Sequence, residues 1–192
     1  MSDTRSRYRE KEETQLRKKL DLLEKQHGLQ HFLTLESLSR LSSVLRSQGR
    51  YGEAETLLKK EVEVWQNFMG DDNPITSDAS IRLSRTIRYQ GRLSATEKLS
   101  KTARMRASDV LASSHPMLLS VMEEHAFCLR SLCRSAECEQ LFSEILKRRA
   151  AMKDLDSKVL LHSKENLGIM HSDRGNHEEG EKFLRKVLAP WT

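Results

Sequence analysis

Apolar and small residues recur along the chain at spacings of three and four, and these stretches come in pairs. The first stretch of one pair carries Leu38, Leu41 and Leu45, and the second carries Ala54 and Leu58. An i, i+3, i+4, i+7 spacing is typical of a helix with one apolar face. Because neither stripe can bury itself alone, the pattern predicts helix pairs that stack against neighbouring pairs.

The paired pattern recurs with a period of 42 residues. The segment GRYGEAE at 49–55 returns as GRLSATE at 91–97, as CRSAECE at 133–139 and as GNHEEGE at 175–181. A second landmark keeps the same step, with His31, Asn73, His115 and Ser157 at equivalent positions. Two markers in phase indicate an internal repeat, and a repeat changes the interpretation of every local motif.

Residues 12–28 align with residues 53–70, so a second helix without its partner precedes the first complete repeat. We therefore expect a charged N-terminal helix at 1–30 that acts as a half repeat and polar cap. Four repeats follow at 31–72, 73–114, 115–156 and 157–192, and together they are expected to form one continuous domain.

Glycine marks the predicted end of three first helices, at Gly49, Gly91 and Gly175, and Cys133 takes this place in the third repeat. Glycine suits such an end because it adopts positive φ at little steric cost. The prolines at 74 and 116 suit the first turn of a helix. A Thr or Ser near each first helix is predicted to be an N-cap or first-turn residue: Thr34, Thr76, Ser114 and Ser157.

These positions resemble the tetratricopeptide repeat, with a small residue at the helix crossing and Gly at the turn. The positions that carry the resemblance are Leu41, Ser42, Leu45, Gly49, Tyr51, Ala54 and Leu58. The 42-residue period is similar to the subtype found in kinesin light chains, and fungal arrays match best. The resemblance covers residues 12–189 and implies an all-α, right-handed solenoid of stacked antiparallel helix pairs, with about nine helices and a protein-binding scaffold function.

Composition and charge limit the function further. The chain has 192 residues, with 33 Lys and Arg against 28 Asp and Glu, so both signs are interspersed and the net charge is only +5. This balance does not demand nucleic acid as a partner. No apolar run reaches the 18 to 20 residues, roughly, that a spanning helix needs, and the charged start is unlike a signal peptide. We therefore expect a soluble, cytoplasmic protein that does not bind membranes.

An arginine recurs at one position of three successive first helices, at Arg46, Arg88 and Arg130, and Ser172 follows in the fourth. In the fold that the resemblance implies, these helices line a concave groove. The planar guanidinium donates two parallel hydrogen bonds to carboxylates or phosphates. The alternative is that these arginines are solvated or pair with the acids of the groove: Glu36, Asp78 and Glu123.

The groove position that follows the small crossing residue is expected to supply apolar anchors in the third and fourth repeats. This position holds Arg85 in the second repeat, Phe127 in the third and Ile169 in the fourth. The predicted partner is therefore a protein or peptide with an extended acidic segment, and the predicted contacts are Arg46, Arg85, Arg88, Phe127, Arg130 and Ile169. Three large residues at the end of one second helix are interpreted as core or linker packing, with an exposed patch as the alternative: Trp65, Phe68 and Met69.

Catalytic signatures are absent from the sequence, which has no GxSxG, HExxH, Walker or dinucleotide motif. Three cysteines without a CxxC pair indicate reduced thiols, and Cys138 replaces a small packed residue. Seven histidines lack the spacing of metal ligands, since His27 and His31 are separated by a linker glycine. We expect no metal and no cofactor.

Two alternative functions stay open. One is a small helical-repeat enzyme or ligand-binding accessory protein of a fungal biosynthetic pathway, with an apolar small-molecule pocket. The other is a self-associating adaptor, in which the last helix packs on its counterpart in a second chain. The predicted contacts of such a homodimer are Phe183, Leu184, Val187 and Trp191.

Overall fold

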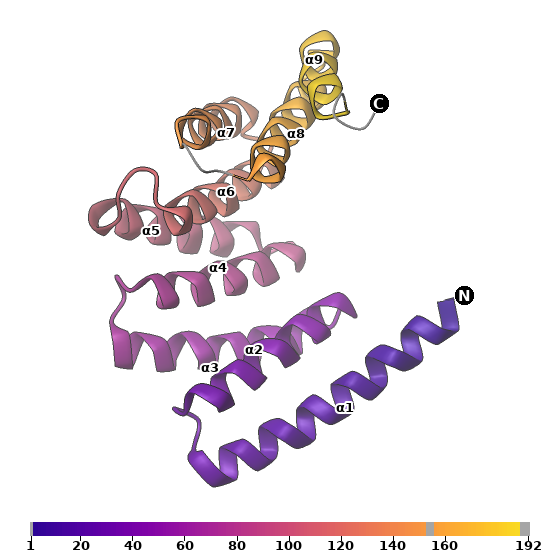
Figure 1. Ribbon diagram of the computed structural model, residues 1–192, viewed down its shortest axis with the longest axis vertical. Coiled ribbons are helices and arrows are strands. Elements are labelled where there is room, and N and C mark those ends of the chain that lie inside the picture. Colours follow the sequence, from indigo (N-terminus) through magenta and orange to yellow (C-terminus); the bar gives the residue numbers. More distant parts are fainter. Residues whose placement is uncertain (1, 153–155, 189–192) are drawn as a thin grey trace. The chain divides into compact units, whose positions relative to one another are not determined.

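The computed structural model describes residues 2–152 and 156–188, and these residues form nine α-helices and no strand (Figure 1). The helices are α1 (Ser2–His27), α2 (Phe32–Ser47), α3 (Tyr51–Met69), α4 (Pro74–Tyr89), α5 (Leu93–Val110), α6 (Pro116–Ser131), α7 (Ser135–Ala150), α8 (Ser157–Asp173) and α9 (His177–Leu188). The short links 48–50, 90–92, 132–134 and 174–176 follow the 42-residue period. The predicted all-α fold is confirmed.

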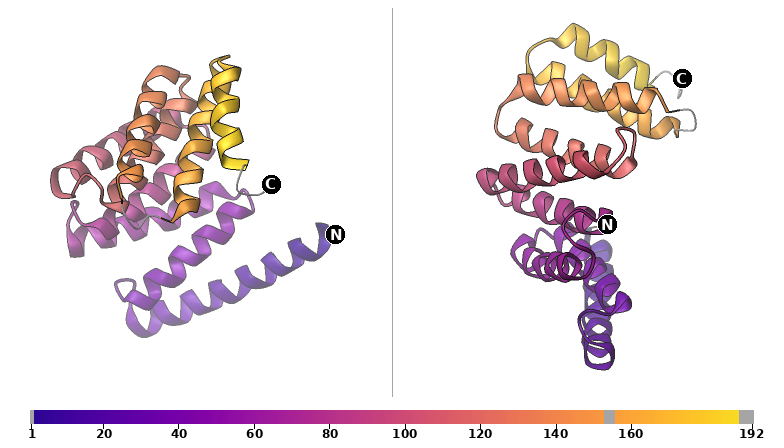
Figure 2. Two further views of the ribbon diagram at one scale, coloured as in Figure 1. Left: turned by 45° about the horizontal axis from the view of Figure 1, so that its top comes forward. Right: turned by 90° about the vertical axis from the view of Figure 1, so that its left-hand side faces the viewer.

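The helices gather into two compact units, Met1–Arg92 and Leu93–Thr192. In the N-terminal unit α1 packs on α2, α2 on α3 and α3 on α4, and in the C-terminal unit α5 packs on α6, α6 on α7, α7 on α8 and α8 on α9. Consecutive helices within a unit run in opposite directions (Figure 2). The repeat boundaries at 31, 73, 115 and 157 and the continuity of the array stay predictions.

Each short link ends its first helix with the same backbone turn. In the first link, Gly49 has φ +77° and donates to the Arg46 carbonyl, and Arg50 donates to the Leu45 carbonyl. This pair of hydrogen bonds is a Schellman motif, which needs a left-handed residue after the helix. The turn recurs at Gly91, Cys133 and Gly175, and Cys133 is the one described non-glycine residue with positive φ.

Thr34, Thr76 and Ser157 lie in the first turns of their helices, which is one of the two predicted placements, whereas the N-caps themselves are other residues. The side chains of His31, Asn73, His115 and Asp156 each accept a hydrogen bond from the backbone N–H two residues later. Thr34 and Thr76 lie buried inside the first turn, and the Thr76 hydroxyl donates to the Gly70 carbonyl. Ser157 begins α8, and Ser114 lies before α6. Histidine caps were missed because histidine is not among the residues that usually cap helices.

Small residues allow the paired helices to cross closely, as the sequence predicts. In the N-terminal unit the core contains Leu41, Leu45 and Ala54, against which Leu16 and Leu20 of α1 pack. In the C-terminal unit α8 and α9 meet at two glycines. A Cβ on Gly168 would lie 2.9 Å from Leu184, and one on Gly180 would lie 2.5 Å from the Ser172 hydroxyl. Neither glycine leaves room for a side chain.

Candidate functional site

Three arginines were predicted to recur at one position of successive first helices, and we call them the arginine ladder. They occupy the same structural position. Arg46, Arg88 and Arg130 lie in the last turns of α2, α4 and α6, and each is half-buried. The carbonyl end of a helix carries partial negative charge, so a cation there also stabilises its own helix. Arg85 is half-buried one turn before Arg88.

In the N-terminal unit two stacked aromatic rings lie beside the second of these arginines, Arg88. The Arg88 guanidinium lies 4.9 Å from the centre of the Tyr89 ring, and Tyr89 stacks on Tyr51 with centroids 5.5 Å apart. Tyr51 begins α3, and Tyr89 ends α4. A guanidinium over an aromatic face is attracted to the ring, which holds Arg88 in place.

In the C-terminal unit the third arginine forms an ion pair. Arg130 Nε donates to Asp173 Oδ2 over 2.7 Å, and both side chains are partly exposed. Phe127 is half-buried, and its ring packs edge-on against Phe142, with centroids 5.3 Å apart. Ile169 of α8 is also half-buried. Exposed ion pairs contribute little stability, so the contact between Arg130 and Asp173 can be exchanged for another carboxylate.

The acids of the alternative interpretation are each bound by an arginine outside the ladder. Glu36 pairs with Arg40 at 3.7 Å, and Asp78 pairs with Arg82 at 3.0 Å. Glu123 accepts from Arg149 Nη1 at 2.7 Å, and Arg149 also donates to the Ser163 hydroxyl. The first helices therefore carry several carboxylates that other parts of the same unit already neutralise.

A second buried ion pair anchors α4 in the N-terminal unit. Arg82 donates through both terminal nitrogens to Glu61 of α3, at 2.9 and 3.0 Å, and also bonds the Ser39 hydroxyl of α2. Burial raises the pKa of Glu61, whereas the guanidinium opposes this shift. Pairs of this kind are structural, since removing one partner leaves a buried charge.

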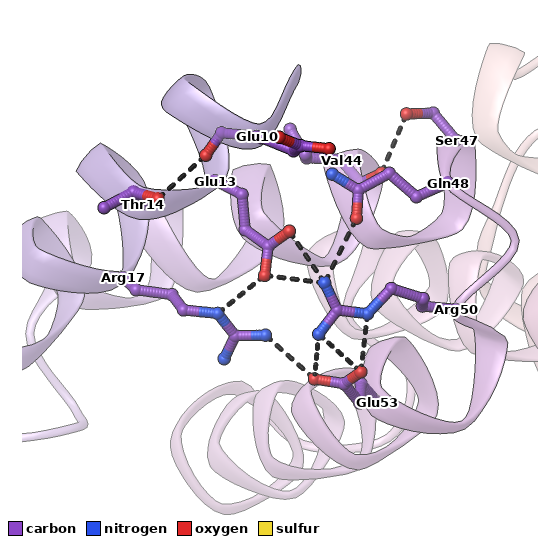
Figure 3. Close-up of polar contacts among 9 residues, drawn as sticks. All are labelled: Glu10, Glu13, Thr14, Arg17, Val44, Ser47, Gln48, Arg50 and Glu53. Carbon is purple, nitrogen blue, oxygen red and sulfur yellow. Dashed lines mark hydrogen bonds and ion pairs between the residues drawn. The ribbon is translucent and has the colours of Figure 1, made fainter. Parts of the chain in front are cut away.

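A further series of arginines, which sequence reasoning missed, lies in the links between first and second helices. Arg50 donates through Nη1 to both carboxylate oxygens of Glu13, at 2.8 and 2.7 Å, and also binds Glu53 (Figure 3). Arg17 of α1 joins the same two carboxylates at 2.8 Å. The hydrogen bonds from Arg17, Gln48 and Arg50 lower the pKa of Glu13 although its partial burial favours the neutral acid.

The same contact recurs along both units, and we call it the turn clasp. Its members are Glu13–Arg50, Glu55–Arg92 and Glu97–Arg134, each 37 residues apart. In the last repeat Asn176 takes the arginine position, and Arg174 binds Glu139 instead. Glutamates at 13, 55, 97 and 139 and arginines at 50, 92 and 134 were a detectable signal in the sequence.

The predicted homodimer contacts lie mostly inside the packing of α9 on α8. The Phe183 ring stacks on His171 with centroids 5.5 Å apart, and Leu184 packs over Gly168. Val187 belongs to α9, but its side chain is outside the described part of the structure, and Trp191 lies outside the described residues altogether. The homodimer stays a prediction.

Two titratable groups outside these clusters, Cys138 and His125, are buried and each contacts a polar partner. Burial raises the pKa of the Cys138 thiol to about 12, and this thiol contacts the Ala126 carbonyl at 3.1 Å. Burial and the neighbouring Arg104 charge lower the pKa of His125 to about 4, and its Nδ1 lies 3.0 Å from the Ser100 hydroxyl. Neither group has the exposure that a nucleophile or a base needs.

In the residues that the structure describes, no set of three His, Cys, Asp or Glu side chains is placed to hold a metal ion. An open depression of about 430 Å³ lies along α7, and its lining is almost entirely polar: Ala136, Glu139, Gln140, Ser143, Glu144, Lys147 and Arg174. It differs from the apolar pocket of the small-molecule alternative. None of the described helices has the length and apolar composition to span a bilayer.

Comparison with known proteins identifies the repeat. Two family models, both described as tetratricopeptide repeat, match residues 33–104 and 160–189. No curated protein sequence matches the chain. Among solved structures, a Podospora anserina kinesin light chain-like protein with nearly identical TPR-like repeats matches with a TM-score of 0.75 at 21% identity, over 97% of this chain and 91% of that chain.

Two more distant structures share the fold. BtubC (BKLC) from P. vanneervenii matches with a TM-score of 0.70 at 13% identity, over 82% of this chain and 63% of that one. YrrB, described as a TPR protein with an unusual peptide-binding site, matches with a TM-score of 0.57 at 13% identity, over 92% of this chain and 78% of that one. At these identities the likeness concerns the fold.

Proposed function

Because this chain is a tetratricopeptide-repeat protein, we propose that it is a non-catalytic scaffold whose first helices bind an extended acidic segment of a partner protein. Stacked helix pairs present long surfaces that suit extended chains, and the fold itself carries no chemistry. The arginines that contact the partner are Arg46, Arg85 and Arg88 in the N-terminal unit and Arg130 in the C-terminal unit.

The observation that carries this proposal is the recurrence of a half-buried arginine in the last turns of α2, α4 and α6. Each unit presents at least one partly exposed guanidinium that a neighbouring side chain holds, Tyr89 in the N-terminal unit and Asp173 in the C-terminal unit. A carboxylate of the partner can replace Asp173 on Arg130, because that ion pair is exposed. Phe127 and Ile169 would contact an apolar side chain of the same segment.

The experiment measures the anisotropy of a fluorescein-labelled peptide of about 12 residues that alternates Glu and Leu, with a Lys and Leu peptide of equal length for comparison. We expect the acidic peptide to bind and the double variant Arg88→Glu, Arg130→Glu to weaken it about tenfold or more. A matched double variant, Lys60→Glu with Lys98→Glu, makes the same charge change on exposed residues of second helices and should have a smaller effect.

If both double variants bound the acidic peptide equally weakly, net charge alone would explain the affinity. If the arginine variant bound it as tightly as the parent chain, the assignment of these arginines to the binding groove would be refuted. Circular dichroism of each variant verifies that the helices are retained.

A further inference from the structure

Five large apolar side chains lie exposed where the long links of the N-terminal unit leave and enter its helices. They belong to the start of α2, the end of α3 and the start of α4. With their exposed fractions they are Phe32 (66%), Leu33 (41%), Phe68 (57%), Met69 (48%) and Ile75 (43%). The interpretation of Phe68 and Met69 as core or linker packing is therefore wrong, whereas Trp65 is half-buried.

These residues lie at one edge of the unit, and we call them the apolar edge. The links 28–31 and 70–73 both lie at this edge, whereas the link between α2 and α3 lies at the opposite one (Figure 1). The helices α2 and α4 run in the same direction, and the contact between Ser39 and Arg82 fixes their register. Leu33 near the start of α2, Ile75 near the start of α4 and the end of α3 therefore all lie on the side of the unit where these two links are found.

The fold of this unit leaves most of this surface in water. Burying a side chain of this size stabilises a protein by about 1.5 to 3 kcal/mol, and here that free energy is not realised in full. Scattered exposed apolar residues are ordinary, whereas five of them on one edge of a unit favour an interaction surface. The stacked rings of His27 and His31, 4.5 Å apart, extend this surface beside Phe32.

The charges around the apolar edge are acidic, although the chain as a whole carries a net charge of +5. Asp71 and Asp72 occupy the link after α3, and Glu24 lies in the last turn of α1. Lys25 pairs with Asp21 at 3.6 Å and is thereby offset. The last turn of α3 has no basic residue that would offset these carboxylates.

We propose that the apolar edge docks an amphipathic helix of a partner protein whose apolar face is flanked by lysine or arginine. The apolar residues would receive a stripe of side chains at helical spacing, and the acidic links would attract the flanking cations. This surface is separate from the arginines of the first helices and takes the opposite charge. The two proposals are independent, so a negative result for the acidic peptide would not contradict this one.

The probe is a fluorescein-labelled peptide of about 15 residues with Leu at i, i+3, i+4 and i+7 positions and Lys elsewhere, titrated with the full chain. A second peptide has Glu in place of every Lys. We expect the lysine peptide to bind at least about tenfold more tightly than the glutamate peptide to the chain in which Arg88→Glu and Arg130→Glu remove the other proposed site.

Two variants test the two components of the surface. Phe32→Ser with Phe68→Ser removes apolar area and should weaken the lysine peptide about tenfold, since these are the most exposed residues of the edge. Asp71→Asn with Asp72→Asn should weaken it severalfold and reduce its dependence on salt between about 0.05 and 0.5 M. The matched control is Met105→Ser, which removes an apolar side chain of similar exposure (56%) from α5 of the C-terminal unit and should change nothing.

Several results would overturn the proposal. They are an absence of binding, equal affinity for the two peptides, or an equal loss of binding in the Met105→Ser control. Sedimentation of the full chain tests whether a second copy of the chain occupies the apolar edge. A dimer that Phe68→Ser converts to monomer would assign the edge to that second copy. Binding of the chain to neutral phosphatidylcholine vesicles, lost in the Phe32→Ser and Phe68→Ser variant, would assign it to lipid instead.

Discussion

Arg92 Nη1 donates to both carboxylate oxygens of Glu55, at 2.8 Å each, although the two residues lie 37 positions apart. Gln90 and Lys59 bind the same carboxylate at 2.8 Å. Partial burial alone would raise the pKa of Glu55, but these hydrogen bonds lower it to about 2. Glu55 thus connects α3 to the link that follows α4, and it must be ionised to do so.

Replacing Glu55 with Gln should destabilise the protein, because the amide keeps the shape but not the charge that Arg92 and Lys59 contact. We expect a loss of about 1 kcal/mol in the free energy of unfolding, measured by urea titration at neutral pH. Glu63→Gln changes an exposed residue of the same helix and should stay within about 0.5 kcal/mol of the parent chain. Equal losses in both variants would contradict a specific role for Glu55.

Acidification should destabilise the C-terminal unit through His125. The folded-state pKa of about 4 lies below the ordinary histidine pKa of 6.5. Between these two pH values the unfolded chain binds a proton at this residue and the folded chain does not. Stability from this group is complete above pH 6.5 and declines as the pH falls toward 4. At pH 5 the loss should be about 2 kcal/mol relative to pH 7.5.

The measurement is urea unfolding at four pH values for the parent chain and for His125→Gln, which cannot titrate. The variant should lose most of the pH slope. A slope that persists in full in His125→Gln, or one that vanishes in the exposed control His162→Gln, would be inconsistent with this assignment.

Cys133 should be more stable as glycine. Its φ of +58° costs an L-residue about 1 to 2 kcal/mol, whereas glycine adopts the conformation freely but loses more entropy on folding. We expect Cys133→Gly to raise the free energy of unfolding by about 1 kcal/mol. The reciprocal variant Gly49→Ala, at φ +77°, should lower it by a similar amount in thermal or urea unfolding. A destabilised Cys133→Gly variant would argue against strain at this turn.

The crossing of α8 and α9 should tolerate no added methyl group. A Cβ on Gly180 would lie 2.8 Å from the Gly168 carbonyl oxygen as well as 2.5 Å from the Ser172 hydroxyl. Gly180→Ala should therefore destabilise the protein by about 2 kcal/mol, despite the higher helix propensity of alanine. Gly52→Ala, in a helical position with no atom near the added carbon, should be neutral or stabilising. A calorimetric scan of both variants makes the comparison.

The helices and the short links were predictable because both depend on local sequence. Apolar spacing predicts each amphipathic stripe, and Gly49 marks a turn that requires positive φ. The turn clasp was not recognised, since Glu13 and Arg50 are informative only when the register between neighbouring repeats is known. Arg82–Glu61 carries no periodic signal at all, because the equivalent positions of the following repeat hold Ala103 and Glu124.

The candidate binding residues were predictable only as positions. The 42-residue frame indicates Arg46 and Arg88 as equivalent, but their half-buried placement follows from packing that periodicity does not describe. For Phe68 the sequence pattern predicts the wrong burial. An apolar residue near the end of a helix stripe was expected to be covered, and Phe68 is exposed. Whether such a residue is buried depends on how far the neighbouring helix extends beyond it.

The turn clasp has a consequence for how the chain unfolds. Each clasp joins the second helix of one repeat to the link of the next, so its energy belongs to the interface and not to either repeat. In a linear array, interface energy is what makes neighbouring repeats melt together. Cutting Glu13–Arg50 should therefore let α1 fray by itself before the rest of its unit. Amide exchange in α1 would then quicken while the protection of α3 and α4 stays nearly constant.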